Sequence, residues 1–336
     1  MKVLSLFDGM ACGMIAMQFA GMEVESYDAY EIDKYAIKTA QHNLPMIKEH
    51  GDVFEADFTQ YEGVDFLIGG SPCTYWSIAQ TKNRETVASG MGWELFSQYV
   101  RALHEAKPKY FIYENNKSMS KDIRASIDKT FGFEAVLINS ALVSAQNRQR
   151  LYWVGKRNDD GTYSKVMVDQ PEDRGILLRD ILESGIAWHE KSYCITATEY
   201  KGSNPQQTLT KHRRTMAAEP VEPRCVAQCG RYPENPKLRV AGLPTEQMFE
   251  AREDGKTHQV YEVRNGLITI KGKQYPIKLK DGYYIIRKLT VRECMRLQTV
   301  PEWYEFPVSD SQAYKMLGNG WTCEVIAHIL KSLKEA

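Results

Sequence analysis

A cysteine follows a buried-strand pattern in the stretch IGGSPCTYWS, residues 68–77. Gly69 and Gly70 let the backbone pass close to a neighbouring group, and Pro72 fixes its own φ and removes an N–H donor directly before Cys73. A structural cysteine needs no such setting. The alternative is a strand-to-loop turn with an incidental thiol, and this stretch alone leaves both interpretations open.

A turn and two acids at the ends of successive strand patterns describe a nucleoside pocket. The loop FDGMACG, residues 7–13, follows the first apolar run, Glu31 closes the second, and Asp52 lies in GDV. A carboxylate at Glu31 can accept both hydroxyls of a ribose, and Asp52 can accept from an adenine amine. Each acid alone is more often an ordinary loop carboxylate. The spacing is not G-x-G-x-x-G, and G-x-x-x-x-G-K-S/T is absent from the sequence, so phosphate recognition is not indicated.

The cysteines form an odd and scattered set: Cys12, Cys73, Cys194, Cys225, Cys229, Cys294 and Cys323. That pattern favours reduced thiols in a cytoplasm-like compartment over a disulfide framework. Cys225 and Cys229, with His212 and His258, are candidates for a zinc site. Their spacing matches no common site, so we expect no metal.

Length and composition are those of a globular protein. The 336 residues, 43% of them hydrophobic and 26% charged, suffice for two domains or for one large domain with an insertion. No apolar run is long enough to span a bilayer, and the N-terminal MKVLSLFDGM starts a strand pattern without a cleavage-site signature. We therefore expect a cytoplasmic protein that contacts no membrane.

Strand and helix patterns alternate over residues 1–157. The strand patterns are KVLSLF, EVESYDAY, VDFLIGG, KYFIYE, FEAVLIN and RLYWVGK, and helical patterns separate most of them, one capped by Asp33 and one stopped at Pro108. This alternation predicts an α/β fold with a mostly parallel sheet covered on both faces. Ligands of such sheets bind beyond the carboxyl ends of the strands, where the unusual loops of this chain lie.

Residues 158–286 have a different character, since turn residues and polar runs replace the alternation and LITIKGKQYPIKL predicts a β-hairpin. Helical spacing resumes over 287–336, which we expect to return to the first domain.

Charge is unevenly distributed along the chain: residues 1–72 carry 4 Lys and Arg against 12 Asp and Glu, whereas 264–296 carry 9 against 2. The acid-free stretch 201–216 adds four candidate nucleic-acid contacts, Lys201, Lys211, Arg213 and Arg214. Solvated charged faces are the alternative.

Five short motifs, taken in their order along the chain, resemble those of a known enzyme family. FDGMACG, GGSPC, YENN, QNRQR and GNGWT resemble the ordered motifs of the DNA (cytosine-5)-methyltransferase family, over residues 1–157 and 287–334. FDGMACG and GGSPC are similar to the vertebrate de novo branch, whereas the long insertion and KMLGNGWTCEVIAHIL look more like phage and bacterial enzymes. The resemblance implies a Rossmann-like methyltransferase sheet that uses S-adenosylmethionine, with an inserted, irregular β-rich target-recognition domain. It also implies a monomer that binds double-stranded DNA in a bacterial or phage-infected cell, with a restriction endonuclease as a candidate functional partner.

The resemblance also assigns catalytic roles. The thiolate of Cys73 adds to carbon 6 of a flipped-out cytosine, because carbon 5 alone is a poor nucleophile. Glu114 holds the ring nitrogen and amine, Arg150 grips the base carbonyl, and Arg148 supports the nucleophile and its loop. Carbon 5 then takes the methyl group of S-adenosylmethionine and loses its proton, and Cys73 is eliminated.

The cofactor contacts implied by the resemblance are Phe7, Asp8, Gly9, Glu31, Ile32, Asp52, Val53, Pro72, Leu95, Asn319, Trp321 and Thr322. Residues 77–92 correspond to a mobile loop that closes over DNA, with Gly90 and Gly92 as hinges; a plain surface loop is the alternative. The chain departs from the family pattern at Asn116, where a small apolar residue is usual, and at Ser71, where many bacterial members have proline.

Other functions stay open at this point. An RNA methyltransferase shares the motifs, although the long insertion argues against it, and a catalytically inactive DNA-binding relative is another alternative. Inactive relatives lose the Pro-Cys or Glu residues that this chain keeps. A nicotinamide-dependent oxidoreductase shares the fold class but does not explain Pro72-Cys73 or QNRQR. The recognised DNA word cannot be predicted from the sequence.

Overall fold

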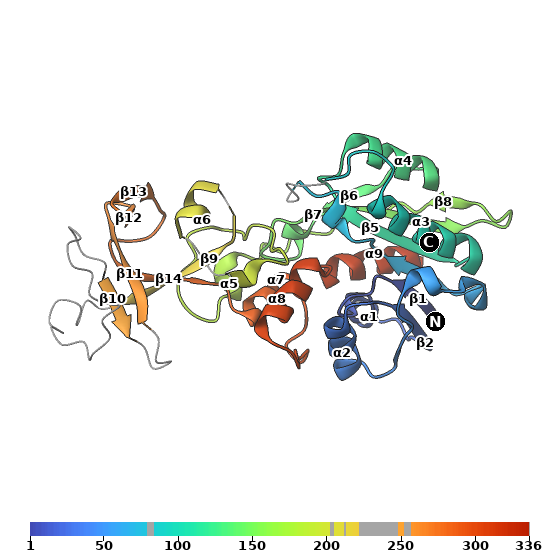
Figure 1. Ribbon diagram of the computed structural model, residues 1–336, viewed down its shortest axis with the longest axis horizontal. Coiled ribbons are helices and arrows are strands. Elements are labelled where there is room, and N and C mark those ends of the chain that lie inside the picture. The colour runs from blue at the N-terminus through green and yellow to red at the C-terminus, as the bar shows by residue number, and fades with distance from the viewer. Residues whose placement is uncertain (79–83, 202–204, 212, 222–247, 252–256, 336) are drawn as a thin grey trace.

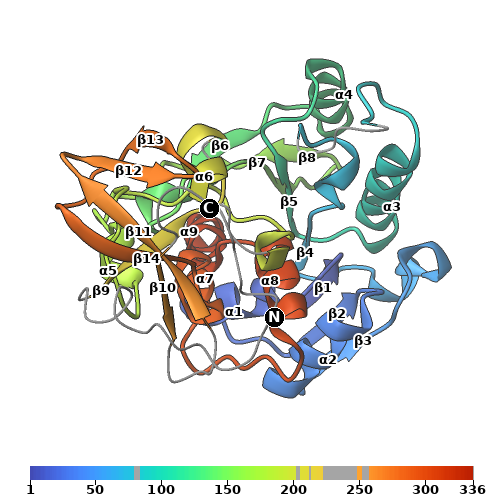
Figure 2. The same cartoon turned by 60° about the vertical axis from the view of Figure 1, so that its left-hand side comes forward.

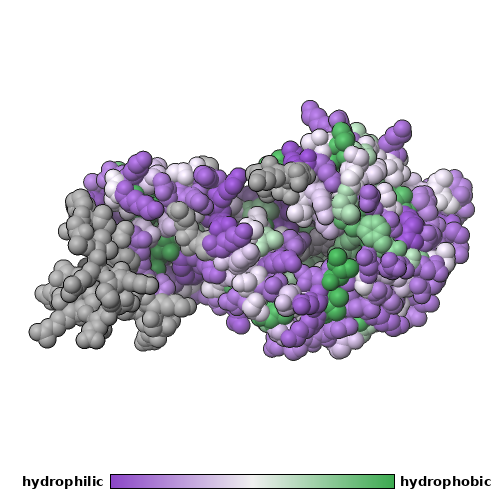
Figure 3. All heavy atoms as spheres, viewed as in Figure 1, coloured by the Kyte–Doolittle hydropathy of each residue, from purple (hydrophilic) through white to green (hydrophobic). Residues whose placement is uncertain are grey.

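The computed structural model describes the chain except residues 79–83, 202–204, 212, 222–247, 252–256 and 336. Figure 1 shows two lobes side by side along the longest axis, and both chain ends lie in the larger one. We call these the large lobe, built on β1 to β8, and the second lobe, built on β9 to β14. In the space-filling view of Figure 3, hydrophilic side chains cover most of this face, and hydrophobic ones gather beside a hollow in the large lobe.

The large lobe contains an eight-stranded sheet in the order β3-β2-β1-β4-β5-β7-β6, with β8 beside β7. Its strands are β1 (Lys2–Leu6), β2 (Ser26–Tyr30), β3 (Ile47–Glu49), β4 (Phe66–Gly69), β5 (Tyr110–Asn116), β6 (Val136–Asn139), β7 (Gln149–Arg157) and β8 (Tyr163–Lys165). Strands β1 to β5 run parallel, and β7 is antiparallel to β5, β6 and β8. The predicted α/β fold with a mostly parallel sheet is confirmed.

Helices cover both faces of this sheet (Figure 2). The helices of the first face are α1 (Cys12–Phe19), α2 (Lys34–Asn43), α7 (Val291–Leu297), α8 (Asp310–Asn319) and α9 (Cys323–Glu335), and those of the second are α3 (Met91–Ala106) and α4 (Lys121–Phe131). Because side chains alternate along a strand, Val3 of β1 packs with the first set and Leu4 with the second. The side chain of Asp33 caps α2 by accepting from the Tyr35 amide, as predicted.

The second lobe is an antiparallel sheet in the order β13-β12-β11-β14-β9, with β10 beside β11. Its strands are β9 (Met216–Val221), β10 (Met248–Ala251), β11 (Thr257–Arg264), β12 (Leu267–Ile270), β13 (Lys273–Pro276) and β14 (Gly282–Lys288), and α6 (Pro205–Lys211) precedes β9. Strands β12 and β13 form the predicted hairpin. Lys271 and Gly272 both have positive φ, 50° and 71°, as a two-residue type I′ turn requires.

The segment between the two sheets packs largely on the large lobe. Strand β8 extends the large sheet beyond residue 157, and Val166, Val168 and Ile195 share the buried cluster of α1 and α9, as does Leu178 in α5 (Leu178–Ile181). The division of the chain after residues 157 and 286 therefore stays a prediction. Among the described helices, none combines the length and apolar character needed to cross a bilayer.

Candidate active site

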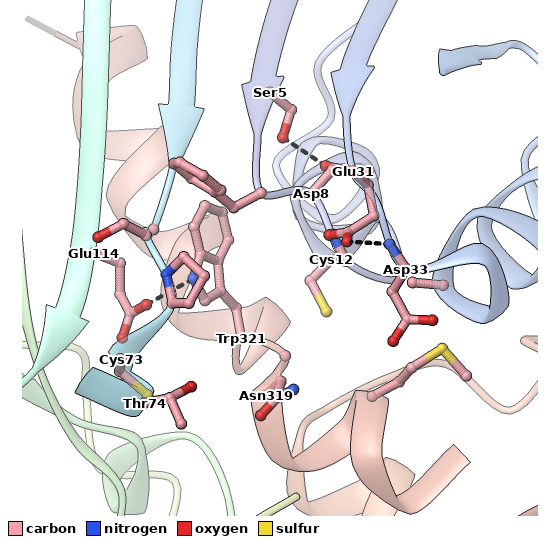
Figure 4. Close-up of a pocket in the computed structure, with 18 of the residues that line it drawn as sticks. Ser5, Asp8, Cys12, Glu31, Asp33, Cys73, Thr74, Glu114, Asn319 and Trp321 are labelled. Atoms are coloured by element: carbon pink, nitrogen blue, oxygen red, sulfur yellow. Dashed lines mark hydrogen bonds between the residues drawn. The ribbon is translucent and has the colours of Figure 1, made fainter. Parts of the chain in front are cut away.

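One pocket, of about 220 Å³, opens at the carboxyl ends of β1, β2, β4 and β5 (Figure 4). We call it the catalytic pocket. Its lining includes seven predicted cofactor residues and all four predicted catalytic residues: Phe7, Asp8, Gly9, Glu31, Pro72, Asn319 and Trp321, with Cys73, Glu114, Arg148 and Arg150. The fold thus brings both predicted sets together from the two ends of the chain and from β4, β5 and β7.

Five predicted cofactor residues lie outside the lining of this pocket: Ile32, Asp52, Val53, Leu95 and Thr322. Ile32 is 74% exposed beside Glu31, whereas Asp52 caps the short helix Val53–Glu55 by accepting from the Phe54 amide. Val53 and Leu95 pack into the cluster of α3 and α4. Thr322 is buried, and its hydroxyl hydrogen-bonds to Gln298 and Ser140. Cofactor contact by these five stays a prediction.

The cofactor side of the pocket is acidic and fixed by hydrogen bonds. Asp8 Oδ1 accepts from the hydroxyls of Ser5, at 2.5 Å, and Tyr27, at 2.6 Å. Glu31 Oε2 accepts from the Gly9 amide at 2.8 Å. Burial raises the pKa of Asp8 to about 6; the two hydroxyls act against the rise and Glu31 adds to it. Asp8 Oδ2 is buried with no hydrogen-bond partner among the described residues, so this wall suits a cationic ligand.

Glu49 is a buried carboxyl group behind the acidic side of the pocket that sequence reasoning missed; it lies outside the lining, but the charges of Asp8 and Glu31 act on it. It ends β3, and both of its carboxyl oxygens are buried without a partner among the described residues. Burial raises its pKa to about 8, and Asp8 and Glu31 contribute to the rise. A glutamate in the short pattern IKE gave no signal, because only the pairing of β3 with β2 brings it near the other acids.

The structure shows why a glycine is needed at position 70, three residues before Cys73. A Cβ at this position would lie 2.8 Å from the backbone oxygen of Glu114 and 2.9 Å from its Oε2. Only glycine therefore lets the loop after β4 pass this close to the Glu114 carboxylate. The chain then turns in a short 3-10 helix, Cys73–Tyr75, in which the Cys73 carbonyl accepts from the amides of Trp76 and Ser77.

The carboxylate of Glu114 is held from two sides. Its Oε1 lies 3.0 Å from Arg150 Nε, and its Oε2 accepts from the Trp321 indole at 2.9 Å (Figure 4). The reversed strand β7 makes the first contact possible, because it places Arg150 opposite Asn116 of β5. The orientation of Glu114 is therefore set before any ligand binds.

Arg148 joins three parts of the chain. Its Nη2 donates to the carbonyls of Gly318, at 3.1 Å, and Gly320, at 2.8 Å, and its Nη1 donates to the Ile195 carbonyl at 3.1 Å. Only 3% of the residue is exposed. Its predicted support of the nucleophile is electrostatic, since its charge acts on the Cys73 thiol while its hydrogen bonds hold the surrounding loops.

The electrostatics keep Cys73 protonated in the free protein. Burial raises the pKa of its thiol, and the charges of Glu114 and Cys194 add to this. Arg150 and Arg148 act in the opposite direction without reversing it. As the predicted nucleophile, Cys73 would depend on the two arginines for any thiolate at neutral pH.

Cys194 is a second thiol at this cluster that sequence reasoning missed. Its Sγ accepts from Arg148 Nη1 at 3.4 Å and from Arg150 Nη2 at 3.8 Å. Burial alone would raise its pKa, but the two guanidinium groups outweigh burial and hold that pKa below the ordinary value. No motif marks this residue, because its place opposite the arginines comes from the tertiary fold.

The two departures from the family pattern have local partners. The hydroxyl groups of Ser71 and Tyr113 are 2.6 Å apart, and Asn115 Nδ2 donates to the Ser71 carbonyl. Asn116 is 5% exposed, its Oδ1 accepts from the Ser118 hydroxyl at 2.7 Å, and its Nδ2 reaches the Cys73 carbonyl at 3.5 Å. Each polar replacement is therefore hydrogen-bonded.

The described ends of loop 77–92 are attached to the large lobe; residues 79–83 lie outside the described residues. Glu85 accepts from the Trp76 indole at 3.1 Å and from the Gly92 amide, and Arg84 donates to the carbonyls of Trp76 and Ser118. Gly92 is tightly packed, since a Cβ there would lie 2.5 Å from Trp76 Nε1. Motion of the loop about Gly90 and Gly92 stays a prediction.

The four predicted DNA contacts lie between the lobes and in the second lobe. Lys201 is exposed on the turn Glu199–Lys201, which packs against α8. Lys211, the last residue of α6, and Arg213 are also exposed. Arg214 is half-buried, with its Nη2 3.5 Å from the Thr198 hydroxyl. Of the zinc candidates, Cys225, Cys229 and His212 lie outside the described residues, whereas His258 is in β11.

Comparisons with known proteins agree with this geometry. The family model described as C-5 cytosine-specific DNA methylase matches residues 1–335. Type II methyltransferase M1.ScrFI of Lactococcus lactis subsp. cremoris is 30% identical over 361 residues, 99% of this chain and 78% of that protein. Orphan methyltransferase M.Rho11sI of Bacillus phage rho11s is 35% identical over 171 residues, which are 47% of this chain and only 33% of the phage protein.

The crystal structure of a Spodoptera frugiperda DNMT2 mutant has a TM-score of 0.61 at 17% identity, over 99% of each chain. That likeness shows the fold alone. The family match and the full-length relative confirm the resemblance that the five motifs predicted. The chain therefore belongs to the C-5 cytosine-specific DNA methylases and is a DNA cytosine methyltransferase.

Proposed function

We propose that this protein methylates carbon 5 of a cytosine within a specific sequence of double-stranded DNA, with Cys73 as the nucleophile. The observation that carries the proposal is the catalytic pocket itself. Its acidic side, with Glu31 and an Asp8 Oδ2 that has no hydrogen-bond partner among the described residues, adjoins the cluster of Cys73, Glu114 and Arg150. Such a pocket suits a cationic donor next to a base that is flipped out of its duplex.

S-Adenosylmethionine supplies the methyl group in this proposal. Glu31 has the acceptor geometry for a ribose, with Oε2 already fixed by the Gly9 amide. Asp8 provides a carboxyl oxygen to which no residue in the described part of the chain donates, and its charge favours the positive charge of a sulfonium compound. Phe7, Pro72, Asn319 and Trp321 complete the lining.

Three residues of the protein then act on the cytosine, each in a different role. Cys73 Sγ bonds to carbon 6, which moves electron density towards carbon 5. Glu114 accepts from the amine of the base, and Arg150 donates to its carbonyl, so both orient the ring and stabilise the charge that develops on it. Carbon 5 takes the methyl group, and S-adenosylhomocysteine is the product that leaves. Carbon 5 then gives its proton to water, and the ring double bond re-forms as Cys73 leaves as a thiolate.

We assign the choice of target to residues 158–286. The second lobe carries four exposed lysines on and beside its hairpin: Lys271, Lys273, Lys278 and Lys280. Lys201, Lys211, Arg213 and Arg214 add positive charge between this lobe and the pocket. Lysine and arginine contacts to phosphates position a protein on DNA, and other side chains then recognise base edges.

Bisulfite sequencing of a plasmid from cells that express the protein tests the proposal. We expect methylated cytosines within one recurring sequence, and none with the Cys73→Ser variant. A duplex carrying 5-fluorocytosine should trap the wild-type protein covalently, because fluorine cannot leave as a proton does. Methylation of RNA but not of the plasmid, or trapping at another residue, would contradict the proposal.

A further inference from the structure

Two sulfur atoms share one pair of guanidinium groups in the catalytic cluster. Arg148 and Arg150 both donate to Cys194 Sγ, and the same two charges act on the Cys73 thiol. We propose that Cys194 is a positioning residue for methyl transfer: its sulfur accepts from Arg148 and Arg150 in the free enzyme and so draws their charge away from Cys73. This inference rests on the proposed function.

The backbone around Cys194 is fixed against the large lobe. The Ile195 amide donates to Gln146 Oε1 at 2.8 Å, and the Ile195 carbonyl accepts from Arg148 at 3.1 Å. Gly318 packs so closely here that an added Cβ would overlap the backbone of Thr196. These contacts fix the backbone of Cys194, so its side chain is held beside Arg148 and Arg150.

Both cysteines are half-buried, but the charges around them differ. Arg148 and Arg150 are the charged groups that act on Cys194, and they hold its pKa below the ordinary value although burial opposes them. Cys73 faces the same two arginines but also Glu114 and Cys194, and its pKa stays raised, mainly by burial. The same two guanidinium groups thus lower the pKa of Cys194, whereas the pKa of Cys73 stays raised.

Arrival of the base changes this balance. Arg150 contacts Cys194 through Nη2 and Glu114 through Nε, and in the proposed function it must donate to the carbonyl of cytosine. When it does so, Cys194 loses part of the charge that stabilises its thiolate. Arg150 also lowers the pKa of Cys73, so both sulfur atoms then depend more on Arg148, which stays hydrogen-bonded to three carbonyls.

The rate of single-turnover methylation measured against pH tests this role. Cys194→Ala removes a negative charge that raises the Cys73 pKa, so the acid limb of the profile should move to lower pH. A displacement of about one pH unit corresponds to a roughly tenfold gain in rate on that limb. Cys194→Ser should act in the same direction, whereas Cys194→Asp, which keeps a negative charge, should leave the limb at or above its wild-type pH.

Cys294→Ala is the matched control, since that cysteine is buried in α7 and should leave the profile in place. A loss of packing lowers the rate at every pH and does not move the limb. An unmoved limb in Cys194→Ala, or the same displacement in the alanine and aspartate variants, would overturn the role of Cys194. The proposed function would survive either result, because it fails only if the wild-type protein neither methylates DNA nor is trapped by 5-fluorocytosine.

Alkylation of the wild-type protein tests the inference without any variant. Iodoacetamide reacts with thiolates, so peptide mass spectrometry across pH should show Cys194 modified at lower pH than Cys73. A duplex that contains the target should slow the modification of both residues. Modification of Cys73 first, at every pH, would contradict the inference.

Discussion

The catalytic pocket and the outer edge of the second lobe differ in how their polar groups are arranged. In the pocket, both oxygens of Glu114 have partners and Arg148 donates to three carbonyls, so the charged groups are already fixed. On the hairpin of β12 and β13, the lysines at 271 and 273 are exposed to solvent. The side chains of the pocket are therefore held in place before a ligand binds, whereas the lysines of the second lobe are exposed to solvent and free to contact DNA.

The largest effect is expected at the nucleophile. Cys73→Ser should reduce methyl transfer by roughly a thousandfold or more, since a hydroxyl is far less ionised than a thiol and cannot add to the ring. DNA binding, measured by a mobility shift, should stay near the wild-type level because the second lobe is untouched. Wild-type turnover in this variant would remove Cys73 from the role of nucleophile.

Gly70→Ala tests how sensitive catalysis is to the position of the loop that carries Cys73. The added methyl group would lie 2.8 Å from one Glu114 oxygen and 2.9 Å from another, so the loop that carries Cys73 must shift. A displacement of about 1 Å at reacting groups costs about a hundredfold in rate, which we expect in kcat.

Gly161→Ala is the control for Gly70→Ala. It lies between β7 and β8 with a φ of 84°, so alanine there should cost about 1–2 kcal/mol of stability without changing kcat. A Gly70→Ala enzyme with wild-type kcat would show that catalysis tolerates movement of the Cys73 loop. The pocket would then not need the fixed arrangement that distinguishes it from the second lobe.

Sequence reasoning reached the parts of this site that local patterns encode. Alternating strand and helix patterns predicted the sheet, and the five motifs predicted the residues that meet in the pocket. The pattern RLYWVGK, however, carries no information on strand direction, and the antiparallel pairing of β7 places Arg150 beside Glu114. Glu49 and Cys194 were missed for the same reason, since only packing between distant segments brings Glu49 near Asp8 and Glu31 and Cys194 to Arg148.

A moderate effect is expected on the cofactor side. Glu31→Ala removes a charged acceptor, and hydrogen bonds to charged groups are worth about 1.5–3 kcal/mol, so the Michaelis constant for S-adenosylmethionine should rise about ten- to a hundredfold. Asp52→Ala should have a smaller effect, because Asp52 lies outside the lining of the pocket and caps a short helix. Calorimetry with both variants checks the order. Unchanged affinity in Glu31→Ala would exclude Glu31 from the site.

The smallest effect is expected from a single exposed cation. Lys211 ends α6 and is exposed, so as a phosphate contact it should add to binding on every sequence alike. Lys211→Ala should weaken DNA binding slightly and lower the slope of log affinity against log salt by about 1. Fluorescence anisotropy with a target and a scrambled duplex, over a range of salt, measures both quantities.

Lys129→Ala is the control for this measurement, since Lys129 is an exposed lysine in α4 of the large lobe. Its loss changes the net charge equally but removes no proposed phosphate contact, so the slope should stay at the wild-type value. Equal slopes for the two variants would mean that Lys211 acts only through net charge. A loss of affinity confined to the target duplex would instead make Lys211 a residue that recognises bases, and the exposed charge of the second lobe would then carry sequence information directly.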